Sequence, residues 1–264
     1  MSKDKLETIL YKIENNIARV TFNRPEVHNA FNDTMIKELT VVFDDIESNQ
    51  DIRVVILTGE GKSFCAGADL NWMRRVKDYS YEDNLKESLD LAEMLYKIYA
   101  SSKPTIARVN GTAIGGGTGL VAVCDIAIAA SNAKFSFSEV KLGLIPACIS
   151  PYVIKKCGEG KCREFFLTGE RMTAEKACAA GLVNLVASLE EIDKVIDKFV
   201  NQLISSGPEA IKKCKELLRK VPEMSLDEAK KYTAEVIAHM RISEEGQEGM
   251  NAFLEKRKPR WAKQ

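Results

Sequence analysis

Apolar and polar residues alternate along two short stretches of the chain, residues 8–14 and 17–22. This two-residue period is typical of strands that are covered on one face only. The polar pair Asn15-Asn16 lies between the two stretches, and asparagine is favoured in tight turns. We therefore expect a β-hairpin over residues 8–22.

Continuous apolar runs replace this alternation further along the chain. The clearest run is residues 54–58, which ends at Gly59, and strands are also predicted at residues 105–109 and 126–130. Runs of this kind are typical of strands whose two faces are both buried. They predict the inner strands of the fold.

Apolar residues at helical spacing separate these strands. Asn32 is predicted to be the N-cap of a helix whose apolar positions recur every three or four residues. These positions are Met35, Ile36, Leu39, Val42, Phe43 and Ile46. A second helix is predicted over residues 81–99. Its expected apolar face consists of Leu85, Leu89, Ala92, Leu95 and Tyr96.

From about Pro146 the pattern becomes almost purely helical, with one short strand predicted at residues 183–186. The predicted helices are residues 190–203, 208–220, 226–239 and 244–256. This change predicts a core over residues 1–200, followed by a helical region over residues 201–264. Helices with apolar faces either form an oligomer interface or cover their own core, and the pattern leaves both alternatives open.

Composition excludes several classes of protein. The chain has 264 residues, of which 45% are hydrophobic and 29% are charged, as in a globular rather than a disordered protein. Its 38 Lys and Arg residues balance 38 Asp and Glu residues, so no net charge attracts nucleic acid or an anionic membrane. We expect no nucleic-acid partner and no membrane partner.

Residue types that commonly bind metals are scarce or poorly spaced. There are two histidines, His28 and His239, and seven cysteines without a CxxC pair. An odd number of cysteines favours free thiols in a reducing compartment. Residues 1–5 form no apolar leader, and the most apolar stretch, residues 120–130, is too short to cross a bilayer. We predict a cytoplasmic protein without a metal site.

Three segments carry residues that are suited to chemistry, and the first is residues 63–70. The small residues Ala66, Gly67 and Ala68 allow a ligand to approach the backbone closely. A helix that begins near Asp69 would also leave free N–H groups facing that ligand. An ordinary turn between a strand and a helix explains the same pattern.

The second segment, residues 110–120, contains the run Gly115-Gly116-Gly117 before a predicted short helix. It does not end in Gly-Lys-Ser/Thr, and Leu120 stands where a GxGxxG turn needs its third glycine. Neither a P-loop nor a dinucleotide-binding turn is therefore predicted. The run can instead direct backbone N–H groups at a polarised oxygen, or it allows the helix to pack closely on the sheet.

The third segment, residues 135–146, places Glu139 between an aromatic strand and an apolar turn. Burial among apolar groups raises the pKa of a carboxylic acid, because it disfavours the charged form. Such a group carries protons near neutral pH. Taken alone, Glu139 is more typical of an exposed loop.

Together these segments resemble the crotonase (enoyl-CoA hydratase/isomerase) superfamily over essentially the whole chain. The matching stretches are Asn23-Arg24-Pro25 with Asn29-Ala30-Phe31-Asn32, residues 64–70, Gly115-Gly116-Gly117 with Cys124-Asp125, residues 137–146, and Leu167-Thr168-Gly169 with Ala174 and residues 177–183. The combination is specific for the superfamily. It is much less specific for one reaction, because a single fold hosts many.

This resemblance implies an α/β fold, the crotonase (ClpP/crotonase-like) spiral of ββα units with a C-terminal helical trimerisation region. It implies a homotrimer or a dimer of trimers that acts on an acyl-CoA, with no cofactor because coenzyme A is part of the substrate. The backbone N–H groups of Ala68 and Gly116 would form an oxyanion hole, and Glu139 would be the acid/base residue. The implied contacts with substrate and coenzyme A are Arg24, Val27, Ala66, Asp69, Leu70, Trp72, Gly115, Gly117 and Leu144.

One position departs from the hydratase pattern. Family hydratases use two glutamates to position water and to move protons, and Glu139 resembles the second of them. Gly119 stands at the position of the first, and glycine has no side chain to hold water or a proton. Glu139 alone would then serve a hydration, the reverse dehydration, or the proton shuttle between C2 and C4 of a Δ3,Δ2-enoyl-CoA isomerase.

Residues 69–73 and 143–152 resemble a bacterial branch similar to methylglutaconyl-CoA hydratases, whose members also carry glycine at this position. The resemblance therefore implies a hydro-lyase, an enoyl-CoA hydratase or dehydratase of fatty acid or branched amino acid catabolism. Its substrate would be a short or branched enoyl-CoA thioester. The isomerase, a CoA-thioester hydrolase and a non-catalytic binding protein are the alternatives. The acyl group, the direction of the reaction and the choice between trimer and hexamer stay open.

Overall fold

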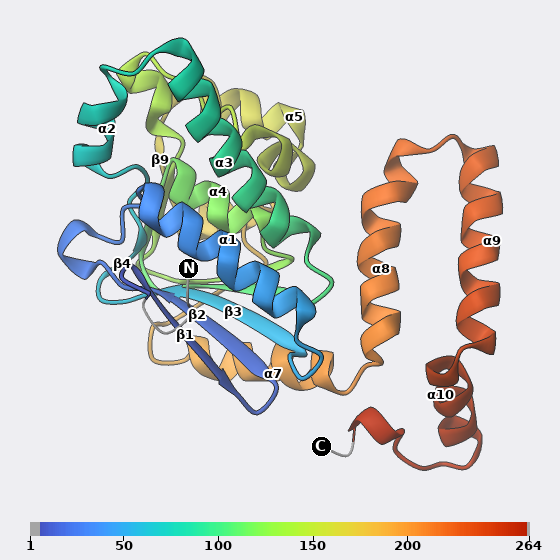
Figure 1. The fold of residues 1–264 in the computed structure, drawn as a ribbon. Coiled ribbons are helices and arrows are strands. Elements are labelled where there is room, and N and C mark those ends of the chain that lie inside the picture. Colours follow the sequence, from blue (N-terminus) through green and yellow to red (C-terminus); the bar gives the residue numbers. More distant parts are fainter. Residues whose placement is uncertain (1–5, 263–264) are drawn as a thin grey trace.

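The computed structural model describes residues 6–262, and within them the larger β-sheet has six strands (Figure 1). In spatial order they are β1 (Ile9–Glu14), β2 (Ile17–Phe22), β3 (Val54–Gly59), β5 (Thr105–Val109), β7 (Ile126–Ala130) and β10 (Leu185–Ala187). The first two strands pair antiparallel, and the other pairs are parallel. Asn15 and Asn16 both have positive φ, as a tight hairpin turn requires. The predicted hairpin is therefore confirmed.

A smaller sheet contains four strands among the described residues. In spatial order they are β4 (Ser63–Cys65), β6 (Thr112–Ile114), β8 (Lys134–Ser136) and β9 (Arg171–Thr173). The strands β4, β6 and β8 each follow a strand of the larger sheet within a few residues, and each leads into helical structure. This repeat is the spiral of ββα units, and the α/β prediction is confirmed.

Strand β3 is apolar throughout because helices cover both faces of the larger sheet. Val55 and Leu57 belong to the core that also contains the buried face of α1 (Asp33–Ser48). Val54 and Ile56, on the opposite face, pack with α7 (Ile192–Ile204). Figure 1 shows α1 and α7 on opposite sides of this sheet.

The other helices follow the predicted pattern closely at several boundaries. They are α2 (Leu70–Val76), α3 (Tyr81–Ala100), α4 (Gly116–Val123), α5 (Ser150–Thr168), α6 (Ala174–Ala179), α8 (Pro208–Lys220), α9 (Leu226–Ile242) and α10 (Glu244–Leu254). Short 3₁₀ turns are Pro25–Val27, Ser138–Leu142, Val221–Glu223 and Arg260–Ala262. Asn32 caps α1 as predicted, since its side chain accepts a hydrogen bond from the N–H of Met35.

The predicted apolar face of α3 is wrong in part. Leu89 and Tyr96 are 59% and 55% exposed, whereas Met94, Leu95 and Ile98 are buried. Only the last turns of α3 pack into the core. The buried residues therefore differ from the apolar face that was predicted along the whole helix. The first half of the helix remains largely exposed.

The shortest strands also differ from the prediction. The strand predicted at residues 183–186 lies at Leu185–Ala187, and Arg171–Thr173 was not predicted as a strand. These strands have only three residues each, and their pairing with β7 and β8 depends on contacts distant in sequence. Local residue pattern carries little of that information.

Helices α8, α9 and α10 extend away from the sheets (Figure 1). The predicted boundary between residues 200 and 201 lies inside α7, and α8 follows it. Lys215 of α8 ties this region to the core, because its ammonium contacts Asp125 Oδ2 at 2.5 Å and the Lys103 carbonyl oxygen at 2.9 Å. Arg219 adds a hydrogen bond to the Ala100 carbonyl oxygen at 2.6 Å.

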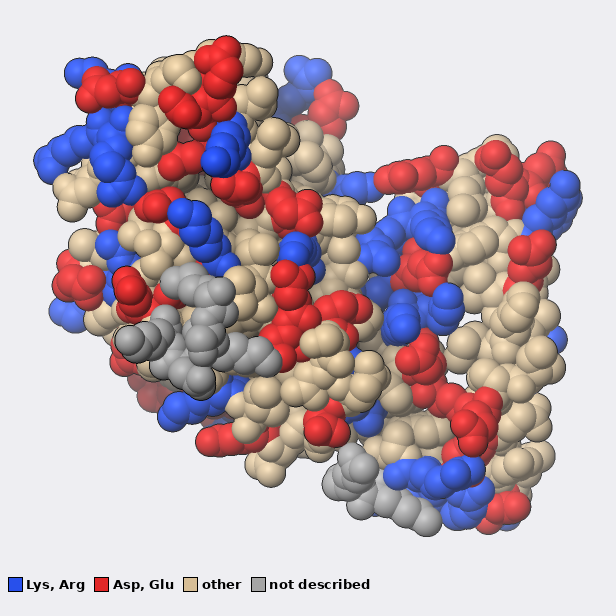
Figure 2. All heavy atoms as spheres, in the orientation of Figure 1, with Lys and Arg blue, Asp and Glu red and all other residues tan. Residues whose placement is uncertain are grey.

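Charges of both signs are interspersed over the face drawn in Figure 2. This agrees with the balanced composition. The described helices include none that combines the length and the apolar character needed to cross a membrane. Residues 1–5, on which the expectation of no leader was based, lie outside the described residues.

Asp125 provides the first test of the fold. Asp125→Ala removes the partner of Lys215, which is only 7% exposed, and also removes hydrogen bonds to Thr105. We expect the free energy of unfolding to fall by about 3 kcal/mol, because a buried charge loses its counter-ion. Lys155→Ala is the control, since its exposed pair with Glu223 contributes less than about 1 kcal/mol. If urea denaturation shows that the two variants lose the same free energy of unfolding, the ion pair between Lys215 and Asp125 does not stabilise the fold as described.

Candidate active site

Two segments distant in sequence meet at the first predicted site segment. The N–H of Phe31 donates to the Gly67 carbonyl oxygen at 2.8 Å, and the N–H of Asp69 donates to the Phe31 carbonyl oxygen at 2.9 Å. These bonds form a parallel bridge between Phe31 and Ala68. They leave the N–H of Ala68 without a hydrogen-bond acceptor among residues 6–262.

The second free donor comes from the start of α4. Gly116 is the first residue of this helix, so its N–H has no partner within the helix. A Cβ added at Gly67 would lie 3.9 Å from the nitrogen of Gly116, so this donor lies close to the segment that carries Ala68. Two backbone N–H groups are thus available at one place.

Glycine is required here because α4 approaches its neighbours so closely. A Cβ on Gly117 would overlap the carbonyl oxygen of Cys65, and one on Gly116 would lie 2.5 Å from the ring of Phe31. Both sequence interpretations of this segment therefore hold, since close packing is what brings the free N–H groups to the site.

Glu139 lies beside these donors, in the short turn Ser138–Leu142. A Cβ added at Gly115 would lie 3.1 Å from Glu139 Oε1, so the carboxylate packs directly against the glycine turn. The other oxygen, Oε2, is buried and has no hydrogen-bond partner within the described structure. Burial raises the pKa of Glu139, because the charged form loses hydration, and this loss outweighs a hydrogen bond from the backbone of Glu139 itself.

These groups open into a cavity of about 400 Å³. Its wall consists of Phe31, Ala66, Gly67, Ala68, Leu70, Trp72, Met73, Ser88, Leu91, Ile114, Gly115, Gly116, Ser138, Glu139, Leu142, Leu144, Ile145, Pro146, Ala147, Cys148 and Ile149. Most of these side chains are apolar. Glu139 is the one carboxylic acid among them, and none of these lining residues is Lys, Arg or His.

Most of the site residues predicted from sequence lie at this cavity. Those that line it are Ala66, Ala68, Leu70, Trp72, Gly115, Gly116, Glu139 and Leu144. Those outside its wall are Arg24, Val27, Asp69, Gly117 and Gly119. The ring of Trp72 packs against Phe31, with 5.7 Å between ring centroids, and its Nε1–H donates to Glu87.

Arg24 and Asp69 support the loop that carries Ala68. Their side chains form an ion pair at 2.8 Å, and Asp69 also accepts hydrogen bonds from the N–H groups of Asn71 and Trp72. Burial alone would raise the pKa of Asp69, but these hydrogen bonds outweigh it and hold the pKa below its ordinary value. Asp69 is thereby the N-cap of α2, which agrees with the helix predicted to begin near this residue.

Gly119 does not face open space. A Cβ added there would overlap Cγ2 of Ile149 and lie 2.7 Å from its Cβ. Ile149 itself lines the cavity and is 3% exposed. An apolar side chain thus fills the place where the resemblance puts a first glutamate. The sequence contains no local signal of this contact, because the two residues are 30 positions apart.

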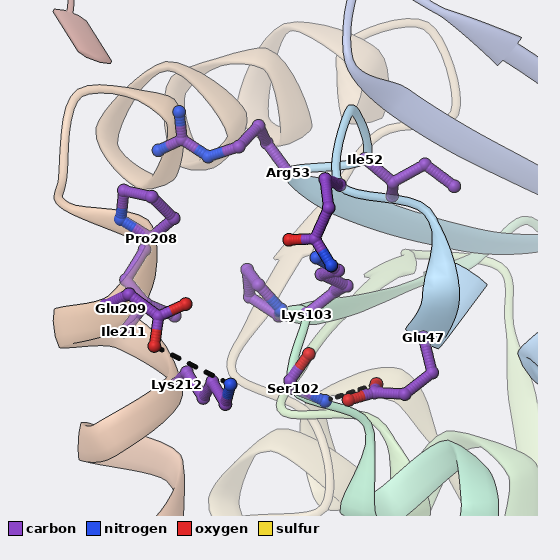
Figure 3. A pocket seen from close by; sticks show the side chains of 11 residues that line it. Glu47, Ile52, Arg53, Ser102, Lys103, Pro208, Glu209, Ile211 and Lys212 are labelled. Atoms are coloured by element: carbon purple, nitrogen blue, oxygen red, sulfur yellow. Dashed lines mark hydrogen bonds and ion pairs between the residues drawn. The ribbon is translucent and has the colours of Figure 1, made fainter. Parts of the chain in front are cut away.

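A second cavity, of about 130 Å³, lies between the core and the start of α8 (Figure 3). Charged groups at its wall already have partners. Lys212 pairs with Glu209 at 3.6 Å, and Glu47 accepts a hydrogen bond from the N–H of Ser102 at 2.8 Å. No described group of three or more His, Cys, Asp or Glu residues could hold a metal ion. The cavity at Glu139 is the candidate site because it combines a buried carboxyl group with the two free N–H groups.

Comparison with known proteins agrees with this geometry. The family model for enoyl-CoA hydratase/isomerase matches residues 12–264. A short-chain-enoyl-CoA hydratase of Clostridium acetobutylicum is 33% identical over 256 residues, which cover 96% of this chain and 97% of the relative. The chain belongs to the enoyl-CoA hydratase/isomerase family.

Solved structures agree with this family in fold. An enoyl-CoA hydratase from Shewanella pealeana is 39% identical, with a TM-score of 0.95, and the match covers 98% of this chain and 97% of that one. AtuE of Pseudomonas aeruginosa is 31% identical, with a TM-score of 0.94, and the match covers 97% of this chain and all of that one. The predicted crotonase fold is therefore confirmed. The prediction of an enzyme of the hydro-lyase kind, similar to enoyl-CoA hydratases, is confirmed at the level of the family.

Burial of Glu139 affects the stability of the protein, and this effect can be measured without a substrate. Because the pKa of Glu139 is raised in the folded state, folding favours the protonated form and the charged form lowers stability. This cost is present at high pH and is lost as the pH falls towards the pKa of the unfolded chain. We expect Glu139→Gln to melt at a higher temperature than the wild type at pH 8, with a difference that shrinks towards pH 4. The exposed Glu26→Gln is the control, and a lower melting temperature for Glu139→Gln at pH 8 would contradict this reasoning.

Proposed function

We propose that this protein adds water across the C2=C3 double bond of a short or branched enoyl-CoA thioester, and that it catalyses the reverse dehydration. One observation carries the proposal. The buried carboxylate oxygen of Glu139 has no partner, and it shares a cavity with the free N–H groups of Ala68 and Gly116. A thioester needs both of these elements for chemistry at C2 and C3.

Ala68 and Gly116 would stabilise the charge that develops on the thioester oxygen. When a nucleophile adds at C3, electrons move through C2 to this oxygen and form an enolate. Two preorganised N–H groups hold that charge better than they hold the neutral carbonyl, and one such donor contributes about 3 kcal/mol to lowering the barrier.

Glu139 would handle both proton transfers. As the oxygen of water bonds to C3, the carboxylate takes one proton from the water and then delivers it to C2. Hydroxyl and proton thus add to the same face, because a single group serves both carbons. An acid whose pKa burial raises towards neutrality is suited to take up and release a proton in one cycle.

The wall of the cavity favours an acyl group without charge. A substrate with a distal carboxylate would place a second negative group near Glu139, and no lining residue is Lys, Arg or His. Burying an unpaired charge is costly, and two nearby carboxylates repel each other. This argues against methylglutaconyl-CoA as the preferred substrate, although residues 69–73 and 143–152 resemble hydratases of that branch.

Isomerisation is the second candidate, and the contact between Gly119 and Ile149 favours it. No second carboxylate is present there to hold water, and an apolar wall suits a proton shuttle between C2 and C4. A thioester hydrolase that acts through a cysteine has less support. Cys148 is the cysteine at the cavity wall, and burial raises the pKa of its thiol, so the thiol is not poised as a nucleophile.

Helices α8, α9 and α10 support the proposal of a homotrimer or a dimer of trimers. They expose large apolar side chains, among them Leu226 at 90% and Phe253 at 82%. Apolar residues exposed to this extent on neighbouring helices are typical of surfaces that a second chain covers. An acyl-CoA is the partner proposed for the cavity, and coenzyme A enters as part of it. A cytoplasmic location stays a prediction.

Product masses test the reaction directly. The protein is incubated with crotonyl-CoA, 3-methylcrotonyl-CoA and a 3-enoyl-CoA, and we expect a product heavier by one water from at least one 2-enoyl thioester. Glu139→Gln should lower the rate about 10²- to 10⁴-fold, because it removes the proton-transfer group while keeping its shape. Conversion of the 3-enoyl-CoA without a change in mass would replace hydration by isomerisation. Free coenzyme A would indicate hydrolysis, and a rate for Glu139→Gln within a few-fold of wild type would refute the assigned role.

A matched pair of substrates tests the charge of the acyl group. 3-Methylcrotonyl-CoA and 3-methylglutaconyl-CoA share the C3 methyl group and differ by a distal carboxyl group. We expect kcat/KM to be at least about 100-fold higher for the uncharged thioester, since an unpaired buried charge costs several kcal/mol. A preference for the carboxylated thioester would overturn this part of the proposal and leave the hydratase activity intact.

A further inference from the structure

Ile149 lies directly on the bare backbone of α4. Gly119 is buried in the middle of that helix, and any Cβ there would overlap Cγ2 of Ile149. The two positions therefore depend on each other. Bulk at residue 149 requires glycine at residue 119, and any larger residue at 119 requires a smaller one at 149.

The side chain of Ile149 and the carboxylate of Glu139 line the same cavity. Gly115, which packs against Glu139, and Gly119, which packs against Ile149, are one helical turn apart. The N–H of Gly119 donates to the Gly115 carbonyl oxygen at 3.1 Å, which fixes that spacing. Both side chains line one cavity of about 400 Å³, so an acyl group bound there reaches both of them.

The backbone holds Ile149 firmly in this place. It is the residue directly before α5, and its carbonyl oxygen accepts hydrogen bonds from the N–H groups of Tyr152 and Val153, both at 3.2 Å. Ser150 anchors the same turn, because its N–H donates to the Pro146 carbonyl oxygen at 3.0 Å. A side chain on a backbone fixed in this way can discriminate between acyl groups of different shape.

We propose that Ile149, together with Gly119, determines which acyl groups the enzyme prefers by packing against the substituents of C3. This inference rests on the proposed function, because it takes C3 of the thioester to lie next to Glu139. An apolar side chain beside that carbon gains contact with a methyl branch and gains nothing from a hydrogen. The preferred acyl group therefore carries an apolar branch at C3.

Binding of saturated thioesters tests the inference apart from catalysis. Butyryl-CoA and 3-methylbutyryl-CoA differ by one methyl group at C3, and neither has a double bond that takes up water. We expect the wild type to bind the branched thioester about fourfold more tightly, the effect of burying one methyl group. Ile149→Ala should reduce this ratio of Kd values to within about twofold, measured by calorimetry.

Ile145→Ala is the matched control, since Ile145 lines the same cavity but is 72% exposed at its rim. It should change the Kd of both thioesters by similar factors and keep their ratio. A wild-type ratio near one, or an unchanged ratio in Ile149→Ala, overturns the inference even where hydration is observed. Loss of the ratio in Ile149→Ala supports it even where hydration is not observed, so the two proposals fail separately.

A double-mutant cycle tests the dependence between the two residues. Gly119→Ala should lower the melting temperature of the wild type, because its methyl group overlaps Ile149, and it should lower the melting temperature of Ile149→Gly much less, because that overlap is absent there. Gly160→Ala is the control, since nothing lies within 4 Å of a Cβ there. Additive effects of the two substitutions would show that the residues do not act as a pair.

Discussion

Close approach of α4 to the smaller sheet is the constraint on which the site depends. Gly117 can have no Cβ because the carbonyl oxygen of Cys65 occupies that place. The same approach brings the free N–H of Gly116 to the segment that carries Ala68, and it seats Glu139 against Gly115. Glycine disfavours helix by about 1 kcal/mol per residue, so tertiary packing rather than local propensity forms α4. The close packing of α4 on the smaller sheet therefore determines both the geometry of the site and the stability of this helix.

Apolar surroundings serve two purposes in the cavity. They raise the pKa of Glu139, since its buried Oε2 has no partner, and this suits it to proton transfer near neutrality. They also make the wall unfavourable for a second charge. Acid–base chemistry and the exclusion of charged acyl groups thus follow from the same absence of basic and hydrogen-bonding side chains along the described wall.

Sequence patterns predict best where local forces and burial agree. The helix capped by Asn32 and the doubly covered strand Val54–Gly59 are of this kind. Patterns fail where contacts between distant segments decide the outcome. Only part of α3 packs into the core, so its buried residues differ from the apolar face that the helical period predicts. Strands of three residues form only because they pair with strands that are distant in the sequence. Contact between Gly119 and Ile149 belongs to this second class, since neither residue signals the other.

That contact also changes the meaning of the missing glutamate. A site that had merely lost a side chain would keep a polar hollow beside Glu139. Here the place is filled by Ile149, which is almost fully buried and fixed at the start of α5. Filling such a space with a rigid apolar side chain restores packing density. The glycine at position 119 is therefore matched by the side chain of Ile149. This argues for a catalytic site with its own acyl preference rather than for an inactive site.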